Sequence, residues 1–223
     1  ERISQSVIVI EPQNKVLQLI TLLKDKVFES VIVFTRTKHK ANRISQKMKA
    51  VGIETEAIHS NKSQAARQKA LNAFKNGDIK ILIATDIAAR GIDVEAVSHI
   101  VNFDMPSTPE DYVHRIGRTA RAGASGIAIS FCEPSERLKL FRIEKLINFR
   151  LEVIKSNLLN PDDLLGYNED TSNKPKVKNH DVNQFENKKY KSSKLATTKG
   201  KSALKRHAKK NKLVQQKKKN KNK

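Results

Sequence analysis

Residues 114–123 place three arginines at intervals of three: Arg115, Arg118 and Arg121. In a helix, steps of three positions keep side chains within about a third of the circumference, so the three guanidinium groups could converge on one target. A guanidinium fork matches phosphate oxygens, and an arginine presented to a γ-phosphate accelerates phosphoryl transfer by roughly 10³ to 10⁵. The same spacing also fits a solvated basic helix face without any chemistry. The pattern alone leaves both interpretations open.

Three further segments carry residue types that suit phosphate binding, namely FTRTK at 34–38, QAAR at 64–67 and ATDIAARGID at 84–93. Two of them follow predicted buried strands and one begins a predicted helix. Strand ends and helix N-termini are natural phosphate cradles. Each segment also has a simpler explanation when taken singly. Thr85 and Asp86 could cap a turn, and Gln64 and Arg67 could be surface polar residues.

In this order and at these spacings, the four segments resemble motifs IV, IVa, V and VI of the DEAD-box RNA helicases. The resemblance covers about residues 5–160 and rests mainly on HRIGRTAR at 114–121 and ATDIAARGID at 84–93. These signatures separate the family from other superfamily 2 helicases, whose last motif usually begins with Gln. Further segments are similar to the RhlE-type bacterial group: VFTRTKH at 33–39, NKSQ at 61–64 and PEDYV at 109–113.

The resemblance implies roles for individual side chains. Arg118 and Arg121 correspond to catalytic arginines that contact the γ-phosphate of ATP, with Arg118 as the expected arginine finger. Asp93 corresponds to the carboxylate that binds the ATP ribose, and His114 and Arg115 correspond to residues that couple the two lobes. The positions implied to lie at or near the RNA backbone are Thr37, Lys38, Gln64, Arg67, Thr85 and Gly91. Such contacts position a protein on RNA without reading the bases.

Two positions depart from the family pattern, which usually has Gly where Ala120 and Ser60 stand. Both replacements are small and remove no charged group. Because each carries a Cβ, the sequence gives little support for a positive φ at either position.

Part of the ATP-hydrolysing machinery is missing from the sequence. The only near match to a phosphate-binding G-x-x-x-x-G-K-[ST] loop is Gly200-Lys201-Ser202, but Leu195 replaces its first Gly and no strand precedes it. No Asp-Glu-Ala-Asp occurs, and the chain begins at Glu1 rather than Met. We therefore expect an upstream N-terminal RecA-like lobe that holds Mg²⁺ and completes the ATP site. We predict no metal site within this chain, and the chain by itself should not hydrolyse ATP.

The elements that must position these residues alternate between short apolar runs and helical periods. The predicted buried strands are 7–10, 31–34, 55–58, 81–84, 99–103 and 126–131. Such alternation predicts an α/β fold with a parallel β-sheet sandwiched by helices, which the resemblance specifies as RecA-like. Gly52 and Gly77 suit helix C-termini, Thr108 suits an N-cap, and a further helix is predicted at 134–147.

Charge divides the chain into a predicted domain at 1–165 and a predicted disordered, lysine-rich tail at 166–223. Of the 44 basic and 23 acidic residues, 19 and 2 respectively lie within 171–223, which gives that segment +17 and leaves +4 for the rest. A polar segment with isolated apolar residues cannot bury enough surface to fold alone. Its lysines would give RNA affinity that is sensitive to salt and independent of base sequence.

The single cysteine, Cys132, has no partner for a disulfide, which fits a cytoplasmic location. No apolar run approaches the roughly 18 residues that span a bilayer, so a membrane partner is not expected. The expected partners are RNA and the N-terminal lobe.

Two functions from different classes remain open at this stage. In the first, the chain is the second lobe of an ATP-dependent RNA helicase, which closes on the first lobe and unwinds RNA duplexes. In the second, it is a non-enzymatic basic RNA-binding protein on a RecA-like scaffold. A DNA translocase is disfavoured by the form of the last motif. Walker-type and DEAD motifs in the upstream coding sequence would discriminate between the first two.

Overall fold

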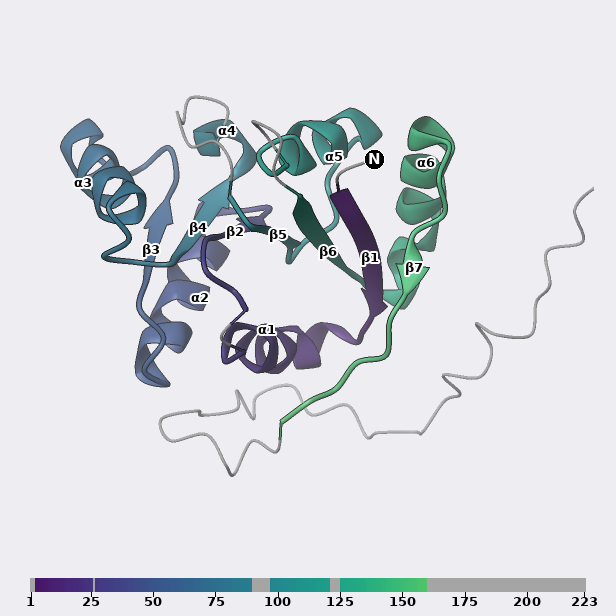
Figure 1. Cartoon of the computed structure of the whole chain (residues 1–223), viewed down its shortest axis with the longest axis horizontal. Helices are drawn as coiled ribbons and strands as arrows, with labels where there is room; N and C mark the ends of the chain where they lie inside the picture. The colour runs from purple at the N-terminus through teal and green to yellow at the C-terminus, as the bar shows by residue number, and fades with distance from the viewer. Residues whose placement is uncertain (1–2, 26, 90–96, 121–124, 160–223) are drawn as a thin grey trace, which may run out of the picture. The chain divides into compact units, whose positions relative to one another are not determined.

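The computed structural model describes residues 3–25, 27–89, 97–120 and 125–159. Within them, seven strands form one parallel sheet in the order β3-β4-β2-β5-β6-β1-β7 (Figure 1). The strands are β1 Ile3–Val9, β2 Val31–Thr35, β3 Thr55–Ile58, β4 Ile81–Thr85, β5 His99–Asn102, β6 Gly126–Cys132 and β7 Glu152–Val153. The helices are α1 Lys15–Leu23, α2 Lys38–Ala50, α3 Gln64–Lys75, α4 Asp86–Ala89, α5 Pro109–Ile116 and α6 Arg137–Ile147. Short 3₁₀ turns at Pro12–Asn14 and Pro134–Glu136 precede α1 and α6.

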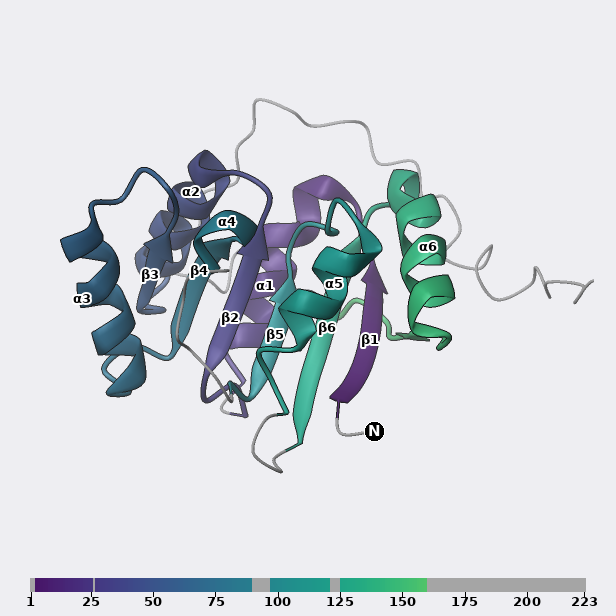
Figure 2. The same ribbon diagram turned by 90° about the horizontal axis from the view of Figure 1, so that it is seen from above.

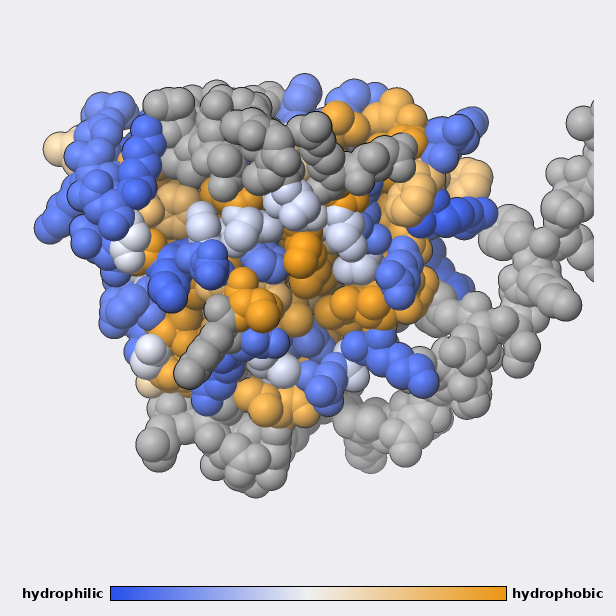
Figure 3. All heavy atoms as spheres, viewed as in Figure 1, coloured by the Kyte–Doolittle hydropathy of each residue, from blue (hydrophilic) through white to orange (hydrophobic). Residues whose placement is uncertain are grey.

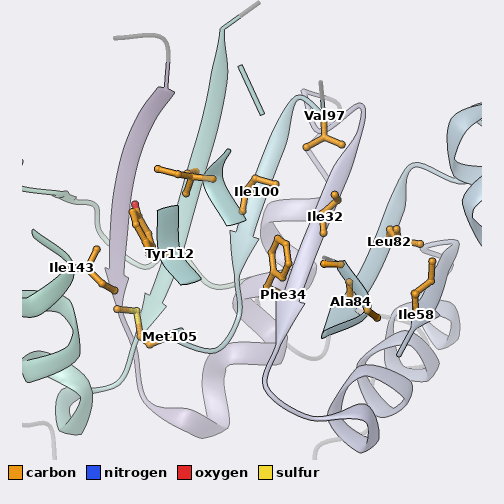
Figure 4. Close-up of a cluster of buried hydrophobic side chains, with 14 of the residues drawn as sticks. Ile32, Phe34, Ile58, Leu82, Ala84, Val97, Ile100, Met105, Tyr112 and Ile143 are labelled. Atoms are coloured by element: carbon orange, nitrogen blue, oxygen red, sulfur yellow. The ribbon is translucent and has the colours of Figure 1, made fainter. Parts of the chain in front are cut away.

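Helices cover both faces of the sheet because its central strands are apolar on both sides. In β2, Val31 and Val33 face a cluster that also includes apolar residues of α1 and α2. Ile32 and Phe34 face the opposite cluster, to which α3, α4, α5 and α6 contribute. Figure 4 shows part of this second cluster, and Figures 1 and 2 show the helices on the two sides of the sheet. The predicted α/β sandwich is confirmed.

The helices α2 and α3, at one end of the sheet, turn polar residues outward. Figure 3 shows hydrophilic atoms gathered over α2 and α3 at one end of the molecule, whereas both hydrophilic and apolar atoms lie near α6 at the other. The outer positions of α2 include Arg43, Gln46 and Lys49, and its inner positions Ile44 and Met48 are buried. This is the helical period that the sequence predicts.

The predicted elements are confirmed with local differences at their ends. β1 begins at Ile3 and pairs with β6 over seven residues, so it starts four positions before the predicted strand. The helix predicted at 134–147 is a 3₁₀ turn followed by α6 from Arg137. Gly52 and Gly77 follow α2 and α3 with φ of 78° and 80°, as expected for glycines that end helices.

The strand β7 and the predicted domain boundary at residue 165 have different outcomes. The two-residue strand β7 was not predicted, because so short a strand carries no periodic signal. The boundary at residue 165 stays a prediction, and the predicted tail lies outside the described residues.

Candidate nucleotide and RNA interface

Residues with predicted RNA contacts gather at the carboxyl ends of three neighbouring strands. Thr85 is the last residue of β4 and pairs in register with Thr35 of β2. Thr37 and Lys38 follow two and three residues after Thr35, where α2 begins. β3 lies on the other side of β4, and the helix that follows it carries Gln64 at its first position. The structure therefore brings segments 50 residues apart in sequence to one edge of the sheet, which we call the β2–β3–β4 edge.

The N-terminus of α2 lies on this edge with a hydroxyl group as its cap. Thr37 Oγ1 accepts a hydrogen bond of 3.2 Å from the backbone N–H of Lys40. A hydroxyl that accepts one bond still has its own proton to donate. Ser63 caps α3 in the same way, accepting from the N–H of Ala66 at 3.2 Å. Both helix ends thus offer donors and a favourable dipole to a phosphate group.

Arg67 ties α3 to α4 and has hydrogen-bonding capacity to spare. Its Nη1 donates to Gln64 Oε1 at 3.3 Å and its Nη2 to the carbonyl of Ala88 at 3.4 Å, both long for such bonds. Its buried Nε has no hydrogen-bond partner in the described part of the chain. A buried donor without a partner is costly, and a phosphate oxygen is the acceptor that a guanidinium matches best.

His59, at the end of β3, reports the electrostatic character of the same edge. The ring is 3% exposed, and its Nε2 lies 3.0 Å from Asn42 Oδ1. Burial first, and then the positive charges of Lys62, Lys38 and His39, lower the pKa of His59 below its usual value. The ring is therefore neutral at pH 7, and cations surround it. Sequence reasoning missed this residue.

Arg115 does not join the other arginines in facing a common target. Its side chain is 3% exposed and donates from Nε and Nη2 to the two oxygens of Asp86, at 2.6 and 2.8 Å. Its Nη1 donates to Asn102 Oδ1 at 3.0 Å and to the carbonyl of Asp104 at 2.8 Å. The helix α5 also ends at Ile116, before Arg118. The predicted convergence of three arginines on one helix face is therefore wrong for Arg115, and its implied role in coupling lobes stays a prediction.

A pocket between α4 and α5 is lined by His114 and Arg118, two further predicted site residues of the motif. Its lining residues are Phe34, Asp86, Ala89, Asp111, His114, Arg115 and Arg118. His114 is exposed and Arg118 is half-buried. Because Arg115 already binds the carboxylate of Asp86, that negative charge opposes an incoming anion less. The guanidinium of Arg118 and the imidazole of His114 are donors that suit a terminal phosphate, and a second carboxylate, that of Asp111, also lines the pocket.

The remaining predicted site residues, Gly91, Asp93 and Arg121, lie outside the described residues. Ala120, at the edge of that gap, adopts a φ of 56°. The family's usual Gly is thus explained by a left-handed backbone, and the expectation drawn from the Ala120 side chain is wrong. Ser60, the other departure, has no positive φ.

In the ranges that the structure describes, no three His, Cys, Asp or Glu side chains cluster as metal ligands would. No helix of the described segments is both long and apolar enough to cross a membrane.

Comparisons with known proteins agree with this geometry. The family model described as the helicase conserved C-terminal domain matches residues 14–123. The crystal structure of the E. coli DEAD-box protein SrmB bound to RraA is 35% identical with a TM-score of 0.62, over 75% of this chain and 96% of that chain. The chain belongs to the DEAD-box RNA helicase family. The part that matches is the family's C-terminal RecA-like lobe. The structure of the C-terminal domain of the DEAD-box protein Dbp5 has 32% sequence identity to this chain and a TM-score of 0.65. The match covers 69% of this chain and 91% of the Dbp5 chain.

Curated relatives of this DEAD-box lobe are longer proteins. The DEAD-box ATP-dependent RNA helicase CshA of Geobacillus kaustophilus is 44% identical over 144 residues, which are 64% of this chain and 31% of that protein. CshA of Bacillus subtilis is 41% identical over 157 residues, which are 70% of this chain and 32% of that protein. The chain thus spans about a third of the length of these relatives. The finer resemblance to the RhlE-type group stays a prediction.

Proposed function

We propose that this lobe works in an ATP-dependent RNA helicase, where it binds the RNA backbone at the β2–β3–β4 edge and presents Arg118 to the γ-phosphate of ATP. The observation that carries the proposal is the adjacency of Thr85 and Asp86. Thr85 ends β4 on the predicted RNA edge, and Asp86 lines the pocket that also contains His114 and Arg118. RNA and nucleotide would therefore meet neighbouring residues of one short segment.

Each side chain has a limited task in this mechanism. Arg118, together with Arg121, would stabilise the charge that develops on the transferred phosphoryl group. Asp93 would accept hydrogen bonds from the ribose, and the N-termini of α2 and α3 would hold RNA phosphates. Hydrolysis of the phosphoanhydride bond of ATP would supply free energy. Mg²⁺ would be held through an N-terminal RecA-like lobe. A solved structure of Dbp5 from S. cerevisiae, 32% identical, is described as bound to RNA and ADP BeF3, which supports the same ligand classes here.

The test is the substitution Arg118→Ala in the full-length protein. We expect ATP turnover to fall by roughly 10³ or more, with RNA affinity within about twofold of wild type. Arg142→Ala is the matched control, because Arg142 is an exposed arginine on α6, an element without a predicted site residue. Turnover at the wild-type rate in Arg118→Ala would refute the assignment of the pocket.

A second function, general RNA tethering, is favoured by the charge of +17 within residues 171–223. This role can coexist with the first. Truncation after residue 170 should flatten the dependence of RNA affinity on salt concentration, because fewer counterions are released on binding. An unchanged salt dependence of RNA affinity would show that the segment does not contact RNA. If the full-length protein binds RNA but has no RNA-stimulated ATPase activity, tethering would be favoured as its main function.

A further inference from the structure

Asp104, just beyond the end of β5, is a buried carboxylate that none of the predicted motifs includes. The residue is 2% exposed, and its strand lies beside β2 in the sheet (Figure 2). Its backbone N–H donates to the carbonyl of Phe34 at 3.3 Å, near the end of β2. The carboxylate is thereby placed under the segment that leads from β2 into α2.

The two carboxylate oxygens hold this segment on either side of Thr37 and Lys38. Oδ2 accepts a hydrogen bond of 2.8 Å from the backbone N–H of Arg36, and Oδ1 accepts one of 2.8 Å from the ammonium group of Lys40. One bond fixes the main chain before the predicted RNA contacts, and the other fixes the first turn of the helix after them. Both bonds are charge-assisted, which makes them shorter and stronger than neutral ones.

The carboxylate is charged at neutral pH despite its burial. Burial by itself raises the pKa of Asp104. The hydrogen bonds from Lys40 and from the Arg36 N–H, with the charges of Lys40 and Lys15, outweigh it and bring the pKa below its usual value. The bonds to the Arg36–Lys40 segment are therefore present in the ionised state that dominates at pH 7.

The main chain of Asp104 also meets the nucleotide side of the lobe. Its carbonyl oxygen accepts Arg115 Nη1 at 2.8 Å, and the same guanidinium binds Asp86. Arg115 also lies over the ring of Phe34, 5.0 Å from its centroid. One residue thus contacts both the segment that begins α2 and the arginine that anchors α5.

The charges around Asp104 come close to balance and do not by themselves favour RNA. Glu136 accepts from Arg36 Nη2 at 3.0 Å and from Lys139 at 2.9 Å, and Glu133 lies 2.7 Å from Lys15 Nζ. The whole group comprises Asp104, Glu133, Glu136, Lys15, Arg36, Lys40 and Lys139. An acid near a polyanion repels it, so charge alone predicts that neutralising Asp104 would strengthen RNA binding.

We propose that Asp104 is a positioning residue for RNA binding, which holds the Arg36–Lys40 segment so that Thr37 and Lys38 face the RNA backbone. Its carbonyl bond to Arg115 keeps the same strand end fixed to α5. The inference rests on the proposed function, because it takes Thr37 and Lys38 as RNA contacts. It goes beyond it by assigning the task of orienting them to a residue that touches neither ligand.

The test is Asp104→Asn in the full-length helicase, measured by RNA-stimulated ATPase activity. An amide keeps the shape but presents an N–H₂ group to one of the two donors that the carboxylate binds. We expect the KM for RNA to rise roughly tenfold, because a charge-assisted bond that orders the segment is lost, while kcat at saturating RNA stays within about twofold. An unchanged KM overturns the proposal. A lowered KM also overturns it, because it would show an effect of charge alone.

Glu56→Gln is the matched control. Glu56, in β3, accepts a hydrogen bond of 2.7 Å at its Oε1 from the ammonium group of Lys49. Lys49 lies near the C-terminal end of α2, away from Lys40. The substitution removes one acid of β3 and its bond to a lysine of α2 without touching the Arg36–Lys40 segment. We expect no change in the KM for RNA, and an equal rise in both variants would overturn a role specific to Asp104.

Two further variants guard against ambiguous outcomes. If Asp104→Asn does not give a cooperative thermal transition, Lys40→Met decides. For this variant, a raised KM for RNA with an unchanged dependence of RNA affinity on salt supports the positioning role. An unchanged KM overturns it. A salt slope reduced by about one also overturns it, because such a reduction identifies Lys40 as a phosphate contact. Lys38→Ala separates the two proposals. No effect of that variant refutes the RNA edge itself, whereas an effect there without one at Asp104 refutes only the positioning role.

Discussion

Arg115 and Arg118 stand three residues apart in one motif, yet the structure places them in different environments. Arg115 is buried and bound to Asp86, Asn102 and the carbonyl of Asp104. Arg118 lies beyond the end of α5, half-buried at a pocket. The first arginine forms part of the lobe's internal structure, and the second is the one we propose as a contact to the γ-phosphate. Equal spacing in sequence therefore does not imply equal function, because a partly buried acid, Asp86, binds one member of the series.

The comparison predicts its largest effect for ATP turnover. Arg118→Ala should reduce turnover by roughly 10³ or more without unfolding the lobe, since it removes charge stabilisation and little packing. Steady-state ATPase kinetics and thermal unfolding of the full-length protein measure the two quantities. Loss of folding in Arg118→Ala would contradict the distinction between the two arginines.

Arg115→Ala should act mainly on stability. It leaves the carboxylate of Asp86 and the amide oxygen of Asn102 without their donor, so we expect the free energy of unfolding to fall by about 3 kcal/mol. Urea unfolding of this chain, followed by circular dichroism, tests the value. A loss below about 1 kcal/mol, as for an exposed arginine, would contradict the buried role.

The caps of α2 and α3 extend the comparison to the RNA edge. Thr37→Ala and Ser63→Ala each remove one N-cap bond and should each cost about 1 kcal/mol of stability. Only Thr37 is a predicted RNA contact, so only Thr37→Ala should also weaken RNA binding beyond what the loss of stability explains. Equal RNA affinity for the two variants would count against Thr37 as a contact.

Ala120, next to the undescribed residues of the motif, predicts a small gain. Ala120→Gly relieves a left-handed backbone at a residue with a Cβ, and we expect the free energy of unfolding to rise by about 0.5 to 1 kcal/mol. The exposed helical position Ala50 supplies the control, because Ala50→Gly should lower it by about 1 kcal/mol. A loss in both variants would show that the strain at Ala120 is absent.

The buried ring of His59 should make the stability of the lobe depend on pH. Its folded pKa lies below the unfolded value of about 6.5, so the unfolded chain binds more protons between the two values. The contribution of His59 to the free energy of unfolding should therefore fall as pH falls below about 6.5, and it should level off below the folded pKa. His99, whose pKa burial also lowers, contributes in the same direction. Denaturant titrations at several pH values should show a weaker dependence for His59→Gln, and an unchanged dependence would contradict the buried, neutral ring.

Local patterns predicted most of the fold and the strand ends that form the β2–β3–β4 edge. The apolar runs identified six strands, and Thr108, whose Oγ1 accepts the N–H of Asp111, was correctly predicted as an N-cap. Parallel strands carry their carboxyl ends to one edge, so the segments that follow β2, β3 and β4 had to come together.

Long-range contacts could not be predicted in the same way. Arg115 and Asp86 are 29 residues apart, and Asp104 and Arg36 are 68 apart. Each residue alone has the polarity of a surface group, and only the packed sheet shows which partner removes it from water. The left-handed Ala120 was missed for a related reason, since its residue type gives no sign of the backbone that its neighbours impose.

The two outermost strands of the sheet are short, with four residues in β3 and two in β7. An edge strand exposes unpaired backbone groups to which another chain can add a strand, and short edges offer few of them. At the β3 end, several copies of this lobe gathered along one RNA would therefore have little backbone through which to join edge to edge. That end of the sheet would allow several lobes to share one RNA without pairing through their edge strands.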